Sequence, residues 1–188
     1  MQLSDETASR LRGAFPARLR ADVEFVVRRL PPPTHKPSTD DIGEVTVHGE
    51  RVKIPYRVYI PEIRDVHVDE FSSTQRLVLA CIYTRHHDGH ARERALRQLP
   101  LPGDAFVAPF IVQLIGEYVV EIVEMILDQV DQVKTPEFRR FVEENQPFLA
   151  RTRQRATSYW DCYYRGPWLR RVDYPGLRLL DALTANGL

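Results

Sequence analysis

One cluster in this sequence has the residue types of a transition-metal site. Three imidazoles and a carboxylate fall within five residues: His86, His87, Asp88 and His90. Imidazole nitrogens and carboxylate oxygens bind zinc and related metals, but His86 and His90 share a face only on a continuous helix, which Gly89 interrupts. We therefore expect a polar turn between two helices. A metal-dependent enzyme centred on His86, His87 and His90 is an alternative.

A second group consists of carboxylates spaced to share one helix face. They follow the helical period: Glu117, Glu121, Glu124, Asp128 and Asp131. Di-iron sites in helical bundles use inward carboxylates, but they combine them with Glu-x-x-His pairs, which this stretch lacks. We expect a solvated face, or one paired with nearby arginines: Arg139, Arg140, Arg151 and Arg153.

The segment 151–171 interleaves arginines with tyrosines and tryptophans, and Asp161 is its single acidic residue. Arginine for phosphates with aromatic rings for bases is typical of single-stranded nucleic-acid sites, and the same residue types dominate the energetics of protein interfaces. A third interpretation buries the aromatic rings in a C-terminal core with arginines around them. The candidate binding residues are Arg151, Arg155, Tyr159, Tyr164, Arg165, Trp168, Arg170 and Arg171.

The N-terminal third predicts helices followed by a hairpin. Ser4-Asp5-Glu6 favours a helix start, and Pro16 predicts a kink or two short helices that end before the prolines. The proline-rich stretch 31–41 predicts an extended connector. Alternating apolar residues on both sides of His48-Gly49-Glu50 predict a β-hairpin over 43–60.

From residue 72 onward the pattern predicts a series of helices. Their ranges are 77–84, 89–99, one long helix over 107–133, a helix from Pro136 that breaks near Pro147 and resumes to 164, and 175–185. Their apolar faces predict one core, formed by Leu77, Leu79, Ile82, Leu96, Leu99, Ile111, Leu114, Ile115, Tyr118, Ile122 and Ile126.

The stretch that begins at Asp88 resembles the second helix of a HEAT repeat. The HEAT pattern contains aspartate, valine-arginine, alanine and leucine, and Ala91 replaces its valine here. The other positions match: Asp88, Arg92, Ala95 and Leu99. The resemblance covers one helical pair, without a second copy of the pattern. It implies a helical hairpin capped by Asp88, with Ala95 at a close helix contact and Arg92 reaching back to the loop, and a surface that binds protein or nucleic acid.

Composition restricts the class of protein. Lys+Arg and Asp+Glu both total 26, so no overall field favours nucleic acid or membrane. Cys81 and Cys162 stand apart in apolar or aromatic surroundings and are expected to be buried thiols. Residues 1–30 lack the apolar run of a secretory signal, and acids interrupt the apolar stretch 111–127. We expect a cytoplasmic protein without a membrane span.

We expect a mainly α-helical protein, a compact HEAT-like or irregular helical bundle with one β-hairpin near 43–60. Its predicted parts are an N-terminal helical arm over 1–30, a Pro-rich linker over 31–41 and a main domain over 42–188. The predicted function is that of a non-catalytic interaction or adaptor protein, with an unknown protein partner and no cofactor. A nucleic-acid-binding protein that uses 151–171 and the metal-dependent enzyme are the alternatives.

Overall fold

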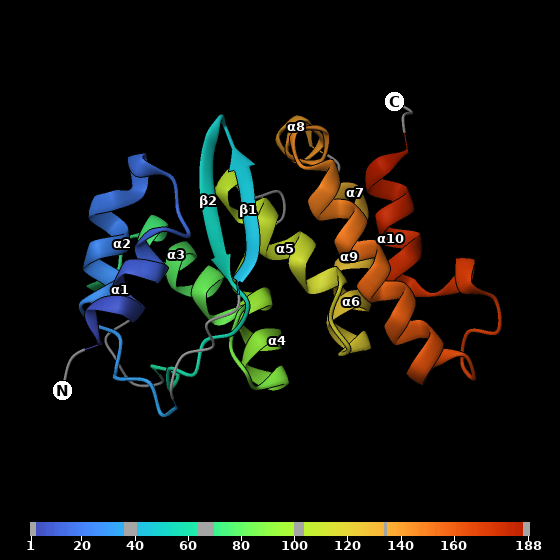
Figure 1. The fold of residues 1–188 in the computed structure, drawn as a ribbon, viewed down its shortest axis with the longest axis horizontal. Coiled ribbons are helices and arrows are strands. Elements are labelled where there is room, and N and C mark those ends of the chain that lie inside the picture. Colours follow the sequence, from blue (N-terminus) through green and yellow to red (C-terminus); the bar gives the residue numbers. More distant parts are fainter. Residues whose placement is uncertain (1–2, 36–40, 64–69, 100–103, 134, 186–188) are drawn as a thin grey trace. The chain divides into compact units, whose positions relative to one another are not determined.

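The computed structural model describes residues 3–35, 41–63, 70–99, 104–133 and 135–185. Within these ranges the chain is mainly helical with one two-stranded hairpin, as predicted (Figure 1). Its contacts divide it into unit 1, residues 1–99, and unit 2, residues 100–188. The sequence placed the boundary at 31–41, whereas the structure keeps the N-terminal helices in the same unit as the hairpin.

Two short helices open unit 1. Helix α1 spans Asp5–Arg12, and the Ser4 side chain accepts a hydrogen bond from a backbone N–H of its first turn. Pro16 comes directly before a 3-10 turn over Ala17–Leu19, which leads into α2, Arg20–Val27. The predicted start and the predicted break at proline are both confirmed, since proline cannot continue the α1 hydrogen-bond ladder.

The hairpin pairs β1, Asp41–Val47, with β2, Glu50–Pro55, in antiparallel register. His48 and Gly49 form its turn with φ of 51° and 82°, the left-handed conformation that two-residue hairpin turns require. The hairpin is confirmed, but β2 ends earlier than the alternating pattern predicted. Past Pro55 the chain leaves the ladder and pairs with another part of unit 1.

Helices α3, Ser73–Tyr83, and α4, Gly89–Arg97, complete unit 1 as consecutive helices. Ser72 and Gln75 form a capping box at the start of α3. At the start of α4 the Asp88 side chain accepts a hydrogen bond from a backbone N–H, which is the cap that the sequence predicted. The two helices follow their predicted ranges closely, and the HEAT resemblance stays a prediction.

The predicted single helix over 107–133 is wrong. The structure has three helices there: α5, Ala108–Ile115, α6, Val120–Leu127, and α7, Val130–Val133. The break begins at Gly116, where a Cβ would lie 3.2 Å from the methyl carbon of Thr152 and 3.4 Å from its carbonyl oxygen. A side chain at that position would crowd the neighbouring helix, so glycine permits the close approach at the point where α5 ends.

The remaining elements of unit 2 are α8, Pro136–Glu144, α9, Gln146–Tyr159, a π-helical turn, Trp160–Tyr164, a 3-10 turn, Arg171–Asp173, and α10, Pro175–Thr184. Helix α10 packs against α6 and α9. Thr135 caps α8 and Pro136 follows at its first position, as the sequence predicted. In the described part of the chain no helix is long and apolar enough to cross a membrane.

The predicted core is divided between the two units. In unit 1 its buried members are Ile82, Leu96 and Leu99, while Leu77 and Leu79 are half-buried. In unit 2 its buried members are Ile111, Leu114, Ile115, Ile122 and Ile126. Tyr118 is 47% exposed and does not belong to a core, because the break after α5 turns it away from the helix face on which it was predicted.

Candidate functional site

The predicted metal-ligand candidates His86, His87 and His90 lie at the turn between α3 and α4. The backbone N–H of Asp88 donates to Nδ1 of His86 at 3.0 Å. The buried guanidinium of Arg92 donates to the carbonyl oxygens of His86 and His87 at 2.9 and 3.0 Å. Arg92 therefore reaches back to the loop, as the resemblance implied. The side chains of His86 and Arg92 thus form hydrogen bonds with the backbone of the same turn.

The structure adds His35 and Tyr59 to this turn. The ring of Tyr59 stacks on His87 with centroids 5.1 Å apart, and His35 lies 5.8 Å from Tyr59 and 6.4 Å from His87. The rings of His86 and His87 are 4.4 Å apart. We call His35, Tyr59, His86 and His87 together the histidine cluster. The sequence treated His35 as isolated, and it carried no signal for this convergence.

Backbone pairing between distant segments creates the histidine cluster. The N–H of Thr34 donates to the carbonyl of Tyr59 at 2.8 Å. The N–H of Val58 donates to the carbonyl of Arg85, and the N–H of His87 donates to the carbonyl of Val58. The proline-rich stretch and the residues after β2 are thus held against the α3–α4 turn. The cluster lies where these three segments meet.

The histidine cluster contains metal-ligand residue types, but their placement differs from that of a metal centre. Among the described residues, no three His, Cys, Asp or Glu side chains are placed to hold a metal ion. His86 is buried, while His87 and His90 are exposed. Burial is the largest cause that lowers the pKa of His86, and neighbouring His87 lowers it further. The described geometry therefore favours a neutral, packed imidazole at His86.

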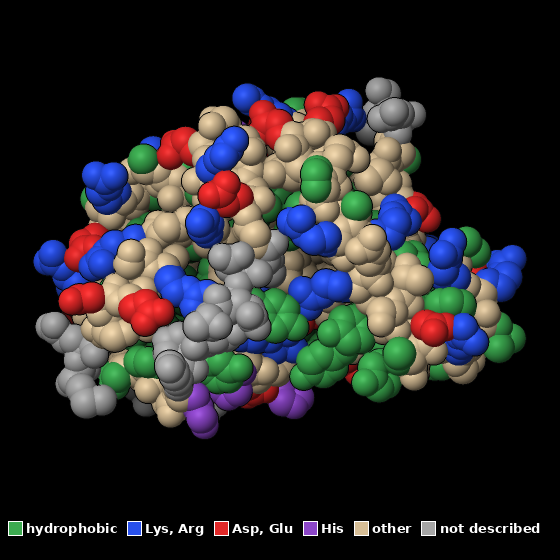
Figure 2. Space-filling view, viewed as in Figure 1, with side chains coloured by type: hydrophobic (Ala, Val, Ile, Leu, Met, Phe, Trp, Pro, Cys, Tyr) green, Lys and Arg blue, Asp and Glu red, His purple; other side chains and the backbone are tan. Residues whose placement is uncertain are grey.

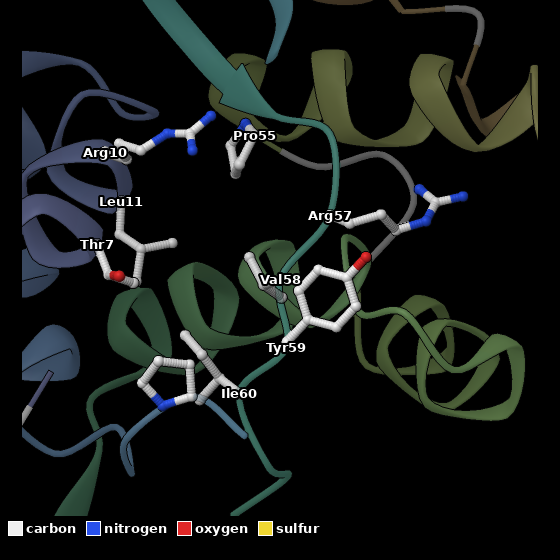
Figure 3. A pocket seen from close by; sticks show the side chains of 9 residues that line it. Thr7, Arg10, Leu11, Pro55, Arg57, Val58, Tyr59 and Ile60 are labelled. Atoms are coloured by element: carbon white, nitrogen blue, oxygen red, sulfur yellow. The ribbon is translucent and has the colours of Figure 1, made fainter. Parts of the chain in front are cut away.

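A pocket of about 320 Å³, open solvent at its mouth included, lies beside this region of unit 1. Figure 3 shows Arg10 reaching across it toward Pro55, while Arg57 points away. Its lining is mostly apolar, and it contains no carboxylate, histidine or cysteine: Thr7, Arg10, Leu11, Pro33, Pro55, Arg57, Val58, Tyr59 and Ile60. This lining lacks the residues of a general acid–base pair.

In unit 2 four tyrosine rings, two of them exposed and two half-buried, form a continuous group, which we call the tyrosine surface. Ring centroids are 6.2 Å apart for Tyr118 and Tyr159, 6.3 Å for Tyr159 and Tyr163, and 6.5 Å for Tyr163 and Tyr164. Tyr163 is 69% exposed. Figure 2 shows hydrophobic side chains gathered on the face of unit 2 around the start of α6. The sequence assigned Tyr118 to the core and did not include Tyr163 among the candidate binding residues.

Hydrogen bonds and ring contacts hold the tyrosine surface in place. The Tyr164 hydroxyl donates to the carbonyl of Tyr118, which lies two residues before α6. The Tyr164 ring stacks on fully buried Tyr174 with centroids 5.5 Å apart. Trp168 contacts both rings edge-on. Tyr164 thus joins the exposed rings to the core of unit 2.

The turn that carries Tyr163 and Tyr164 is π-helical, and none of its residues is buried. It includes Cys162, which is exposed, so the prediction of a buried thiol there is wrong, while Cys81 is buried as predicted. The Trp160 indole donates to the carbonyl of Trp168 at 2.8 Å and ties the turn to the next segment. π-helical turns are rare and frequently occur at functional sites.

Several arginines of segment 151–171 form ion pairs with acidic residues outside the group 117–131 with which the sequence analysis expected pairing. These ion pairs include Arg153 with Asp181, Arg165 with Asp161, and Arg170 with Asp173. Of the other candidate binding residues, Arg151 and Arg171 are exposed, and Arg155, Tyr159, Tyr164 and Trp168 are half-buried. The segment is therefore less positive than its arginine count suggests.

The predicted acidic stripe is also corrected. Because the helix breaks after Gly116, Glu117 is fully buried, while Glu121 and Glu124 are exposed on α6. Arg140, one of its expected partners, pairs with Glu144 at 2.8 Å instead. Burial is the largest cause that raises the pKa of Tyr164, and the charges of Glu121 and Glu124 raise it further.

Comparisons of the chain with protein-family models, curated proteins and solved structures found no match. The functional argument therefore depends on the geometry of the two regions. In the histidine cluster, polar groups bind the chain's own backbone. In the tyrosine surface, large side chains remain exposed on a fixed support.

Proposed function

We propose that this chain is a non-catalytic interaction protein and that the tyrosine surface is its contact with a protein partner. The observation that carries the proposal is the exposure of large apolar side chains of unit 2, at Tyr118 before α6 and within residues 163–172. Besides Tyr118 and Tyr163, Leu169 is 85% exposed and Val172 is 58% exposed. Contiguous exposed apolar side chains mark interaction sites, and tyrosine and tryptophan are enriched among the residues that dominate binding energy.

The fixed geometry of the rings supports the same proposal. Tyr164 is held by its hydrogen bond to the carbonyl of Tyr118, just before α6, and by the buried ring of Tyr174. A side chain that is ordered before binding loses less conformational entropy when a partner docks. The tyrosine surface therefore has both the residue types and the preorganisation of a contact site.

A nucleic-acid partner has weaker support. Unit 2 contains 12 acidic and 10 basic side chains, and three of the arginines in segment 151–171 are paired with carboxylates. Nucleic-acid affinity depends strongly on cations that can neutralise phosphates. The proposal of a protein partner needs no such excess.

A cytoplasmic location and a HEAT-like character of the α3–α4 pair are part of this proposal. Two free cysteines, one of them exposed, suit a reducing compartment. The close approach of α3 and α4 depends on alanine, since Ala91 and Ala95 are both buried on α4. The cap at Asp88 and the inward Arg92 support the helical-hairpin resemblance.

Photo-crosslinking tests the proposed contact. A benzophenone amino acid replaces Tyr163, and a matched control places it at half-buried Tyr56 in unit 1. We expect position 163 to crosslink one protein in a cytoplasmic extract, and the purified protein to form the same adduct when the two are mixed. Equal crosslinking from both positions, or none from position 163, would contradict the proposal.

A further inference from the structure

We infer that the pocket of unit 1 binds a small apolar carboxylate, whose carboxyl group lies against the guanidinium of Arg10. The pocket and the tyrosine surface belong to different units, so this inference goes beyond the proposed function and does not depend on it. Three features carry it: the apolar walls of the pocket, the cation that reaches across it, and the hydrogen bonds that fix its walls.

Three segments of unit 1 form the walls of the pocket. One face of α1 contributes Thr7, Arg10 and Leu11, which are three and four residues apart. The proline-rich stretch contributes Pro33, and the chain at and after the end of β2 forms the remaining wall. Figure 3 shows Leu11 and Val58 pointing into the space from opposite sides. Aliphatic side chains and proline rings thus offer apolar surface against which a ligand can be buried, as in most ligand pockets.

The guanidinium of Arg10 supplies a charge to this apolar space. Figure 3 shows it reaching across the pocket toward Pro55, whereas Arg57 points away. Arg57 donates a hydrogen bond to the carbonyl of Tyr56 at 3.0 Å and lies over the ring of the same residue at 4.7 Å. Arg10 is therefore the cation that a ligand inside the pocket would meet.

The charges around the pocket favour an anion. None of the described residues that line it is acidic. The acids of α1, Asp5 and Glu6, are exposed, so salt in the solvent screens their charge. On the hairpin, Glu44 is also exposed and pairs with Arg51 and Lys53. A guanidinium has five N–H donors and can hold a carboxylate through two parallel hydrogen bonds while it keeps a contact within the protein.

Hydrogen bonds fix the wall that follows β2. The N–H of Thr34 donates to the carbonyl of Tyr59 at 2.8 Å, and the N–H of Val58 donates to the carbonyl of Arg85 at 2.8 Å. The buried guanidinium of Arg85 donates to the carbonyl of Tyr56 at 3.0 Å. A wall that is ordered before binding loses little conformational entropy when a ligand enters.

The volume of the pocket limits the size of the ligand. About 320 Å³, open solvent at the mouth included, lies at the lower end of the range of roughly 300–1,000 Å³ that is usual for ligand pockets. One aromatic ring or a short branched chain beside the carboxyl group suits this volume, and a long acyl chain does not. Because the lining also lacks an acid–base pair, the inferred activity is binding.

Methyl NMR of the intact chain tests the site with three probes that differ in their polar group: 3-phenylpropionate, 3-phenylpropanol and 3-phenylpropylamine. We expect 3-phenylpropionate to shift the methyl signals of Leu11, Val58 and Ile60 saturably, with a Kd below about 1 mM. The methyl signals of Ile115, buried in unit 2, should not move. The alcohol should bind about tenfold more weakly, since it lacks the charged hydrogen bonds, and the amine should not bind.

Arg10→Gln tests the role of the guanidinium. We expect it to weaken the binding of 3-phenylpropionate by about tenfold and to leave the binding of 3-phenylpropanol unchanged, because the apolar walls remain. Arg28→Gln is the matched control: Arg28 is exposed, pairs with Glu24 within α2 and does not line the pocket. Circular dichroism verifies that each variant is folded.

Several results would overturn the inference. Absence of saturable shifts at Leu11, Val58 and Ile60 would remove the site, and equal affinity for the acid, the alcohol and the amine would remove the carboxylate. Equal losses in Arg10→Gln and Arg28→Gln would assign the effect to net charge. The same shifts with inorganic phosphate alone would indicate a site for simple anions. If Arg10→Gln does not fold, the three probes on the wild-type chain still decide between these outcomes.

Discussion

The histidine cluster of unit 1 and the tyrosine surface of unit 2 are built from similar parts and have different surroundings. Both are chains of aromatic rings that bring together segments distant in sequence. In the histidine cluster, Thr34 and Val58 form backbone hydrogen bonds with the segments that carry the rings, and buried Arg92 fixes the turn. In the tyrosine surface, the Tyr164 hydroxyl donates to the carbonyl of Tyr118, and Tyr163 projects into solvent.

This comparison shows that ring contacts by themselves do not identify a binding site. The two regions differ in the hydrogen-bond partners of their polar atoms and in the amount of apolar surface that stays exposed. Groups that bind the chain's own backbone stabilise the fold, because a buried donor or acceptor that loses its partner is costly. Exposed rings add little to folding and remain available to a partner. Substitutions in the two regions should therefore affect different properties.

The largest effect is expected from the cores beneath the two regions. Leu96 in unit 1 is 3% exposed and Ile115 in unit 2 is fully buried. Each leaves a cavity when truncated to alanine, and we expect a loss of about 2–5 kcal/mol in the free energy of unfolding. Chemical denaturation measures both. Losses below about 1 kcal/mol in both variants would contradict the assigned cores, since buried aliphatic truncations rarely cost so little.

Arg92→Met is expected to rank next, because it removes the donors to the carbonyl oxygens of His86 and His87. Hydrogen bonds from a charged donor contribute about 1.5–3 kcal/mol each, so we expect a loss of about 2–4 kcal/mol. Arg94→Met on the same helix is the matched control: Arg94 is exposed and pairs with Glu62 at the surface, and such pairs contribute little. Equal effects of the two substitutions would show that Arg92 does not hold the turn.

Acid should weaken the histidine cluster selectively. His86 has a pKa below its ordinary 6.5, chiefly through burial and next through His87, while Glu62 and Asp88 act in the opposite direction. A lowered pKa means that the fold favours neutral imidazole. Its stabilising contribution is complete above pH 6.5 and is lost as the pH falls below that value, because the unfolded chain takes up the proton first.

Denaturation midpoints measured between neutral pH and pH 5.5 test this expectation. The wild-type chain should lose stability over this range, and His86→Asn should lose less. Glu24 does not titrate in this range, because hydrogen bonds from Arg12 and Arg28 lower its pKa to about 2. The same pH dependence in His86→Asn and wild type would assign the effect to other groups.

The smallest change in stability is expected from Arg170→Glu combined with Arg171→Glu. Both side chains are exposed, and the pair of Arg170 with Asp173 lies at the surface. We expect a melting temperature close to wild type and weaker binding of the crosslinked partner, because both side chains belong to the candidate contact segment 151–171. Unfolding of this variant would mean that the segment is structural, and unchanged binding would place the contact elsewhere.

Signals confined to a few residues made much of the fold predictable. The Asp88 cap, the His48-Gly49 turn and the Thr135-Pro136 helix start depend on local backbone chemistry, and each occurs where the sequence indicated. The break at Gly116 was missed, and the close packing of this glycine on Thr152 joins residues far apart in the chain, which the sequence does not show. An isolated glycine within an apolar helical run was the available signal.

The candidate sites were harder to predict for the same reason. Segment 151–171 was identified by composition, but composition could not show that Asp173 and Asp181 pair with its arginines. His35 and Tyr59 lie close together because the irregular segments that carry them form a backbone hydrogen bond. Such pairing gives no periodic pattern in the sequence. Exposure of Tyr163 follows from the π-helical turn, since one added residue per turn rotates the following side chains away from their predicted face.

The central claim is that the exposed rings of unit 2 serve binding and those of unit 1 serve the fold. The most direct test is the affinity of the purified, crosslinked partner for Tyr163→Ala and Tyr59→Ala, measured by calorimetry together with the melting temperature of each variant. For Tyr163→Ala the account predicts an affinity loss of about tenfold or more and an unchanged melting temperature. For Tyr59→Ala it predicts unchanged affinity and a lower melting temperature. Full affinity in Tyr163→Ala, or its unfolding, would contradict the account.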